Sequence, residues 1–208
     1  MKKLYLLRHG QTEFNVKKLV QGRCDSPLTD LGRKQAGMAA TWLKDHGVVP
    51  DKVVSSPLGR AMDTASLVAI ELLGPDAAVE PCEGIIERCY GTFEEGPHDA
   101  LPTDVWDPGE DLVPFGGEGS KALQERMVAT LTNLISAEDI ETLLAVSHGS
   151  ASRQFIKAAA PEGFELPAKL PNCAIMIFDF KEEKSGEEGD APQSKFILQQ
   201  IIDPQQSN

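Results

Sequence analysis

Apolar runs and segments with helical periodicity alternate along most of the chain. Short apolar runs typical of buried strands cover residues 3–8, 51–55, 78–81, 142–147, 174–180 and 195–202. Apolar residues recur at helical spacing in residues 29–47, 58–72, 120–137 and 149–160. This order predicts a three-layer α/β/α sandwich around a mostly parallel sheet, and the last two runs predict an antiparallel edge.

Two of the predicted helices carry recognisable ends. The segment 29–47 places Leu31 on its buried stripe and ends at Gly47, a common stop signal. Before the next helix, Ser56 is predicted to be the N-cap because Pro57 follows it, and proline is favoured at the first helical position.

Residues 96–119 interrupt the alternation. The segment is rich in proline, glycine and aspartate and shows no apolar periodicity. Long irregular loops inside a compact domain often have a function, so we predict that this segment is a lid over the site. The polar residues 181–194 are predicted to be a solvated hairpin loop between the last two strands.

Composition narrows the class of protein. The chain has 208 residues, 41% of them hydrophobic, which fits one compact domain over residues 1–208. Its apolar runs are far shorter than the ~20 residues that span a bilayer. Only four apolar residues precede Arg8-His9, too few for a secretory signal. The net charge of −12 argues against nucleic acid or an anionic membrane as a partner.

The cysteines indicate neither a disulfide framework nor a zinc site. Cys24, Cys82, Cys89 and Cys173 are scattered without a paired spacing. We therefore expect reduced thiols and a cytoplasmic protein.

Three predicted strands end in residues that can bind an anion. Arg8 and His9 follow the first strand, Arg60 lies just beyond the second, and His148 follows the fourth. A glycine after each histidine allows a sharp turn and a close approach to a ligand. Because ligands bind beyond the carboxyl ends of parallel strands, we expect these side chains and the adjacent helix N-termini to bind one tetrahedral dianion, such as phosphate.

A neutral imidazole at such a site can attack phosphorus. Cationic surroundings lower the pKa of a histidine, so His9 is expected to be a neutral nucleophile. The phosphoryl group then needs only positioning and charge stabilisation. Glu87, between an apolar pair and Tyr90-Gly91, is the candidate proton donor for the leaving oxygen.

These residues resemble the motifs of the histidine phosphatase superfamily, in its phosphoglycerate-mutase-like branch, over residues 4–202. Five blocks match in order: Arg8-His9-Gly10 with residues 11–15, Gln21-Gly22 with residues 25–29 and Gly32, Ser55-Ser56-Pro57 with Arg60-Ala61 and Thr64-Ala65, Glu87 with Tyr90-Gly91 and Glu95-Gly96, and Ser147-His148-Gly149. A lone Arg-His-Gly would be a weak signal, whereas five ordered blocks at strand ends are a specific one.

The resemblance implies a phosphoglycerate mutase-like fold and a phosphohistidine intermediate on His9. Arg8, Arg60 and His148 would hold the phosphoryl oxygens. Glu87 would protonate the leaving group and then deprotonate the attacking water. Further substrate contacts are expected from Asn15, Gln21, Gly22, Arg88 and Gly149. No metal or other cofactor is implied. The remaining histidines, His46 and His98, are expected to be exposed.

The favoured function is a histidine acid phosphatase-like phosphomonoesterase acting on a small phosphorylated metabolite. The related mutases carry a longer, basic insertion where this chain has a short acidic loop. A phosphoglycerate mutase remains the alternative, because Glu87-Arg88-Cys89-Tyr90-Gly91 resembles the mutase version of that block. A catalytically inactive, phospho-ligand-binding scaffold is less favoured because the nucleophile and the acid are both present. The sequence leaves the oligomeric state open.

Overall fold

The computed structural model describes residues 1–160, 164–183 and 193–206. Within them, six strands form one sheet in the order β3-β2-β4-β1-β5-β6. The strands are β1 (Lys2–Arg8), β2 (Lys52–Ser55), β3 (Glu80–Pro81), β4 (Thr142–Ser147), β5 (Ile175–Glu183) and β6 (Gln193–Ile202). The first four are parallel, whereas β5 and β6 run antiparallel at one edge, which confirms the predicted mixed sheet.

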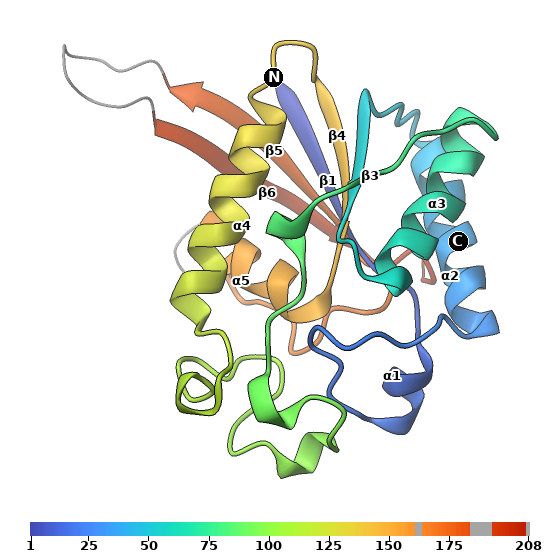
Figure 1. Ribbon diagram of the computed structural model, residues 1–208. Helices are drawn as coiled ribbons and strands as arrows, with labels where there is room; N and C mark the ends of the chain where they lie inside the picture. Colours follow the sequence, from blue (N-terminus) through green and yellow to red (C-terminus); the bar gives the residue numbers. More distant parts are fainter. Residues whose placement is uncertain (161–163, 184–192, 207–208) are drawn as a thin grey trace.

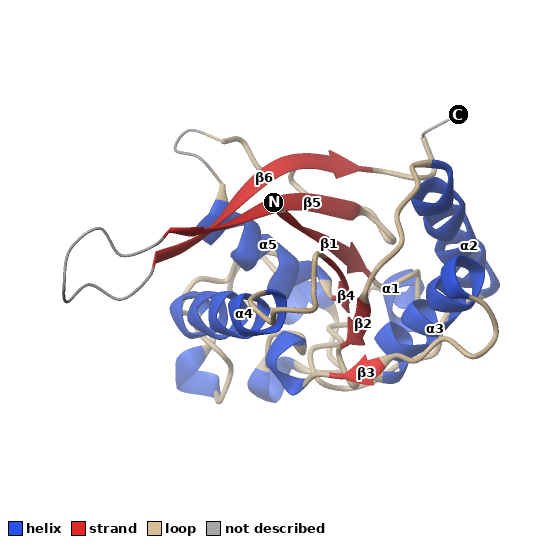
Figure 2. Ribbon diagram, turned by 90° about the horizontal axis from the view of Figure 1, so that it is seen from above, coloured by secondary structure: helices blue, strands red, loops and turns tan. Residues whose placement is uncertain are grey.

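The helices cover both faces of the sheet. They are α1 (Glu13–Lys17), α2 (Asp30–Asp45), α3 (Gly59–Leu73), α4 (Ser120–Ile135) and α5 (Gly149–Ala159). Figure 2 shows α2 and α3 on one face and α4 and α5 on the other, so the predicted three-layer sandwich is confirmed. None of the described helices is long and apolar enough to cross a bilayer.

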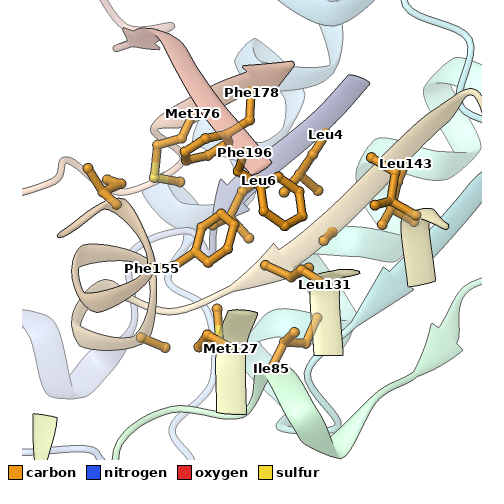
Figure 3. Packing of buried hydrophobic residues seen from close by; sticks show 14 of the residues in the cluster. Leu4, Leu6, Ile85, Met127, Leu131, Leu143, Phe155, Met176, Phe178 and Phe196 are labelled. Carbon is orange, nitrogen blue, oxygen red and sulfur yellow. The ribbon is translucent and has the colours of Figure 1, made fainter. Parts of the chain in front are cut away.

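Each face of the sheet has its own apolar core. On the α4 and α5 side, Phe155 packs edge-on against Phe178 and Phe196, with ring centroids 5.0 Å apart in each pair (Figure 3). On the other side, buried alanines such as Ala36 and Ala65 let α2 and α3 lie close to the strands. Both cores hold the carboxyl ends of the strands in fixed positions.

The start of α3 differs from the prediction. The helix begins at Gly59, two residues after Pro57, and Ser56 is not its N-cap. Instead, the Asp25 carboxylate accepts hydrogen bonds from the backbone N–H groups of Gly59 and Arg60, at 2.6 and 3.4 Å. A cap supplied from 34 residues away leaves no local trace in the sequence, which explains the error.

Smaller differences concern the surface. Leu31 is 45% exposed, so its predicted place on the buried stripe of α2 was wrong. The short helix α1 was not predicted, although Thr12 and Asn15 form a capping box at its start. Residues 96–119 contain two 3₁₀ turns, His98–Ala100 and Val113–Phe115. Most of the predicted loop 181–194 lies outside the described residues.

Candidate active site

Three strands bring the predicted residues to one edge of the sheet. In the sheet register, Arg8 of β1 pairs with Ser147 of β4, and Ser55 of β2 pairs with Val146. His9, Ser56 and His148 are the next residues along the chain, and they lie side by side. Figure 1 shows α1 and the green segment 96–119 beyond this same edge.

A small pocket opens at these strand ends. It is lined by Arg8, His9, Asn15, Leu19, Val20, Gln21, Gly22, Arg60, Glu87, Tyr90, His98, Val105, Trp106, Gly149 and Ser150. Its volume of about 60 Å³ is small compared with the ~300–1,000 Å³ of typical small-molecule sites. A phosphoryl group fits within such a space, and the rest of a larger ester would extend toward the opening of the pocket. Among the described residues, no cluster of three His, Cys, Asp or Glu side chains has a metal-site arrangement.

The imidazole of His9 is held as a neutral ring. Its Nδ1 lies 2.7 Å from the carbonyl oxygen of Gly10, so Nδ1 carries the proton and Nε2 keeps its lone pair. Burial, followed by the charges of Arg60 and Arg8, lowers the pKa of His9 well below 6.5. The predicted direction is therefore correct, but burial contributes more than the cations.

Gly10 fixes the position of this ring. A Cβ atom at Gly10 would lie 2.5 Å from the carbonyl oxygen of Gly32 in α2, so only glycine fits here. The Gly10 N–H also donates to the hydroxyl of Thr64 in α3 at 3.1 Å. Gly10 thus allows close packing against two helices.

His148 lies beside His9 and is completely buried. Their ring centroids are 5.2 Å apart, and Nε2 of His148 is 2.6 Å from Oγ of Ser56. Burial and then the charge of Arg60 lower the pKa of His148 well below 6.5. Two neutral imidazoles therefore share a site with two guanidinium groups.

The guanidinium of Arg8 is clamped between a carbonyl and an indole. One Nη donates to the Leu170 carbonyl, and the group lies 5.0 Å from the Trp106 ring centroid. Burial lowers the pKa of Arg8 to about 10, which leaves it charged at neutral pH. A Cβ at Gly149 would lie 2.7 Å from Trp106 and 3.3 Å from Nε of Arg8, so glycine is required at the start of α5.

The guanidinium of Arg60 is held by the loop that precedes α2. It donates to the carbonyls of Gly22 and Cys24 at 2.7 and 2.8 Å and pairs with Asp25 at 3.1 Å. Only 1% of this side chain is exposed. Burial lowers its pKa, while Glu87 and Asp25 oppose that effect.

Both arginines retain one buried donor for a ligand. The Nε–H groups of Arg8 and Arg60 have no hydrogen-bond partner among the described residues. A buried donor without a partner costs ~1–3 kcal/mol, and phosphoryl oxygens would remove that cost. The arrangement is therefore suited to an anion.

Glu87 occupies the N-terminus of α5. Its carboxylate accepts hydrogen bonds from the backbone N–H groups of Ala151 at 2.8 Å, Ser150 at 3.2 Å and Arg88 at 2.8 Å. Asp25 caps α3 in the same way. The expectation that these helix N-termini bind the dianion directly needs correction, because carboxylates already engage their amides.

The other expected substrate contacts divide into two groups. Asn15, Gln21, Gly22 and Gly149 line the pocket. Arg88 does not line it: its fully buried guanidinium bonds to Ser150, Ser120 and the carbonyls of Gly109 and Glu118. The expected role of Arg88 in substrate binding is therefore replaced by a structural one, tying residues 109–120 to α5.

Two aromatic side chains in the pocket wall were missed. Trp106 covers Arg8, and His98, which was expected to be exposed, is half-buried with Nε2 3.2 Å from the carbonyl of Leu19. Both belong to the segment 96–119, where no periodic pattern indicated which side chains face inward. The proline and glycine content was the only signal, and it identified the segment but not the residues.

The segment 96–119 is fixed to the domain on both sides of Trp106. The Tyr90 hydroxyl donates to the Val105 carbonyl at 2.7 Å. The Asp107 carboxylate accepts from Gln154 at 2.8 Å and pairs with Lys157. Although desolvation opposes it, these contacts lower the pKa of Asp107.

Glu94 was also missed, and it organises the loop around Arg60. Its carboxylate accepts from the backbone N–H groups of Arg23, Cys24 and Tyr90 at 2.9–3.2 Å. It thus joins the loop that holds Arg60 to the turn that follows Glu87. We regard Glu94 as a positioning residue that acts through Arg60.

Comparison with known proteins identifies similar chains. A family model described as histidine phosphatase superfamily (branch 1) matches residues 4–188. A probable phosphoglycerate mutase GpmB from Escherichia fergusonii is 32% identical, over 88% of this chain and 87% of that protein.

Solved structures share the fold. A phosphoglycerate mutase from Bacillus anthracis has a TM-score of 0.72 at 23% identity, over 85% of this chain and 87% of that one. A phosphoserine phosphatase mutant from Entamoeba histolytica, in complex with phosphoserine, has a TM-score of 0.73 at 27% identity, over 99% and 98%. The predicted phosphoglycerate mutase-like fold is confirmed.

Replacing Glu94 tests its positioning role. Glu94→Gln exchanges one acceptor for a donor opposite three N–H groups, so it should weaken inorganic phosphate binding about tenfold, equivalent to ~1.4 kcal/mol. Titration calorimetry measures the affinity, with Glu125→Gln on the exposed face of α4 as the control. In an Arg60→Ala background the same change should cost little. Equal losses in both backgrounds would refute a role through Arg60.

The burial of the two histidines predicts a pH dependence of stability. The unfolded chain binds protons near pH 6.5, whereas folded His9 and His148 do not until far lower pH. The free energy of unfolding should therefore fall as the pH drops below about 6.5. Histidine NMR titration with urea unfolding at several pH values checks this, with exposed His46 as a spectral reference. Titration midpoints of 6.5 or higher for His9 and His148 would contradict it.

Proposed function

Because the chain belongs to the histidine phosphatase superfamily, we propose that it is a metal-independent phosphatase that hydrolyses small phosphate monoesters through a phosphohistidine intermediate on His9. The observation that carries the proposal is the neutral His9 ring, whose Nε2 keeps its lone pair in a pocket with two buried guanidinium groups. Such a site combines a nucleophile with charge stabilisation.

In the first step, Nε2 of His9 attacks phosphorus and the bond from phosphorus to the ester oxygen breaks. The leaving oxygen takes a proton from Glu87, which lines the same pocket. Arg8 and Arg60 balance the charge on the transferring group.

In the second step, water replaces the alcohol. Glu87, which lost its proton in the first step, accepts a proton from the water while the water oxygen attacks phosphorus. The bond from phosphorus to nitrogen breaks, its electron pair returns to Nε2 of His9, and inorganic phosphate leaves. In both steps the proton stays on Nδ1, which donates it in a hydrogen bond to the Gly10 carbonyl. The ring therefore returns to the tautomer with a lone pair on Nε2.

The segment 96–119 favours hydrolysis over phosphoryl transfer between phosphoglycerates. It contains six acidic residues and no lysine or arginine. A mutase must retain a second phosphorylated molecule, and this segment supplies no cation to hold it. The similarity to a probable phosphoglycerate mutase GpmB supports the mutase alternative, and the similarity to a phosphoserine phosphatase supports hydrolysis.

An assay panel separates the two activities. The protein should release phosphate from p-nitrophenyl phosphate and sugar phosphates in the presence of EDTA. His9→Ala should reduce this at least ~10³-fold, because the nucleophile is lost, whereas His46→Ala should not. The same panel includes 3-phosphoglycerate with and without 2,3-bisphosphoglycerate. Interconversion of 3- and 2-phosphoglycerate with negligible phosphate release would show that the protein is a mutase.

The leaving-group dependence of a Glu87 variant tests the assigned acid. Glu87→Gln should slow hydrolysis of alkyl phosphates ~10²–10⁴-fold and that of p-nitrophenyl phosphate much less, because p-nitrophenolate leaves without a proton. Single-turnover rates for both esters measure the difference, and exposed Glu83→Gln is the matched control. Equal effects on the two esters would exclude Glu87 as the acid.

A further inference from the structure

The residues that line the pocket form two sets, which we call its inner and outer halves. The inner half contains His9, Arg8, Arg60 and Glu87, which act on the phosphoryl group under the proposed function. The outer half is the wall formed by three other segments, which the leaving alcohol must contact. Its lining residues come from the loop after α1, the turn after Glu87 and the segment 96–119: Leu19, Val20, Gln21, Tyr90, His98, Val105 and Trp106.

The described residues of the outer half include no cation. Among the described residues that line the pocket, only Arg8 and Arg60 are positively charged, and both belong to the inner half. His98 does not supply a charge at neutral pH, because burial lowers its pKa below 6.5. A carboxylate or second phosphate on the leaving group would therefore lose water without gaining a counter-charge.

Cations near the pocket have partners or lie in solvent. Lys157 pairs with Asp107, and Arg23 is 3.7 Å from Glu118. Arg88 is enclosed by oxygen acceptors away from the pocket. Lys18 and Lys169, whose charges act on His98, are exposed, so water screens them.

The segment that forms the outer wall is itself acidic. Of its six carboxyl groups, Asp107 pairs with Lys157 and Glu118 with Arg126, whereas four form no ion pair among the described residues: Asp99, Asp104, Glu110 and Asp111. An anionic leaving group would meet this negative field on entering. The outer half does offer apolar surface from Leu19, Val20 and Val105, the indole of Trp106 and neutral hydrogen-bonding groups on His98 and Gln21.

We propose that the outer half selects monoesters whose leaving alcohol is uncharged and has an apolar or aromatic face, and that it rejects leaving groups with a carboxylate or a second phosphate. This substrate class rests on the proposed function of the inner half. Trp106 is its main specificity-determining residue, because its ring is held over Arg8 and between two anchors of the segment, Val105 and Asp107.

A matched pair of ligands tests the selection by charge. Glycerol 3-phosphate and 3-phosphoglycerate share a three-carbon skeleton and differ in one end, a hydroxymethyl group or a carboxylate. For the wild-type protein, kcat/KM should be at least ~10-fold higher for glycerol 3-phosphate. Binding to the His9→Ala variant, measured by calorimetry, should show the same order without any turnover.

Equal or tighter binding of 3-phosphoglycerate would overturn the inference. If no ester releases phosphate but the binding order holds, the proposed phosphatase function fails and the charge selection stands. The two failures are therefore distinguishable.

Two variants test which residues cause the selection. Val105→Lys places a cation in the outer wall and should raise the affinity for 3-phosphoglycerate relative to glycerol 3-phosphate at least ~5-fold. Val113→Lys adds the same charge at an exposed position of the segment and should not. Thermal unfolding confirms that both variants fold. If both lysines raised the relative affinity for 3-phosphoglycerate equally, the selection by charge would not arise in the outer half of the pocket.

A substitution of Trp106 tests the apolar face. Trp106→Ala should weaken binding of phenyl phosphate at least ~5-fold more than binding of glycerol 3-phosphate. The substitution removes the indole from Arg8 whichever ligand is bound, but only phenyl phosphate also loses packing of its ring against the indole. Equal losses for the two ligands would show that Trp106 acts only through Arg8 and would overturn its assigned role.

Discussion

The burial of two guanidinium groups beside two uncharged histidines is the constraint on which the rest of the site depends. A buried cation requires hydrogen-bond acceptors, and three backbone carbonyls, from Leu170, Gly22 and Cys24, provide them. Those carbonyls belong to loops, so the loops must adopt one conformation for the arginines to stay charged. Burial of the imidazoles, and then the charges of the arginines, keep His9 and His148 neutral, which is the state that a histidine nucleophile requires.

Carboxylates connect this charge balance to the helices. Asp25 pairs with Arg60 and caps α3, the helix that carries Arg60. Glu87 binds the first amides of α5, the helix that follows His148. Each carboxylate therefore places its negative charge near both the positive end of a helix dipole and a guanidinium group. These contacts tie Glu87, the arginines and the strand ends to one another, and fixed groups of this kind preorganise a pocket for a dianion.

Local patterns predicted most of this arrangement, and long-range contacts account for the rest. His9 and His148 were predictable because each follows a strand, and adjacent parallel strands bring their ends together. Glu94 acts through contacts with a loop about 70 residues away, which no local pattern encodes. Arg88 follows Glu87 directly and was expected at the substrate, but the chain turns it toward residues 109–120. Trp106 lies in a segment without periodicity, where composition indicates a loop but not its inward face.

In the proposed reaction, His9 carries the phosphoryl group during turnover. The most direct measurement is to quench the protein in alkali during hydrolysis of a ³²P-labelled phosphate ester and to map the label by peptide mass spectrometry. We expect an acid-labile, alkali-stable phosphoryl group on the peptide that contains His9, formed at a rate sufficient for turnover and absent from His9→Ala. An acid-stable label on a serine, or hydrolysis of the ester at full rate by His9→Ala, would contradict it.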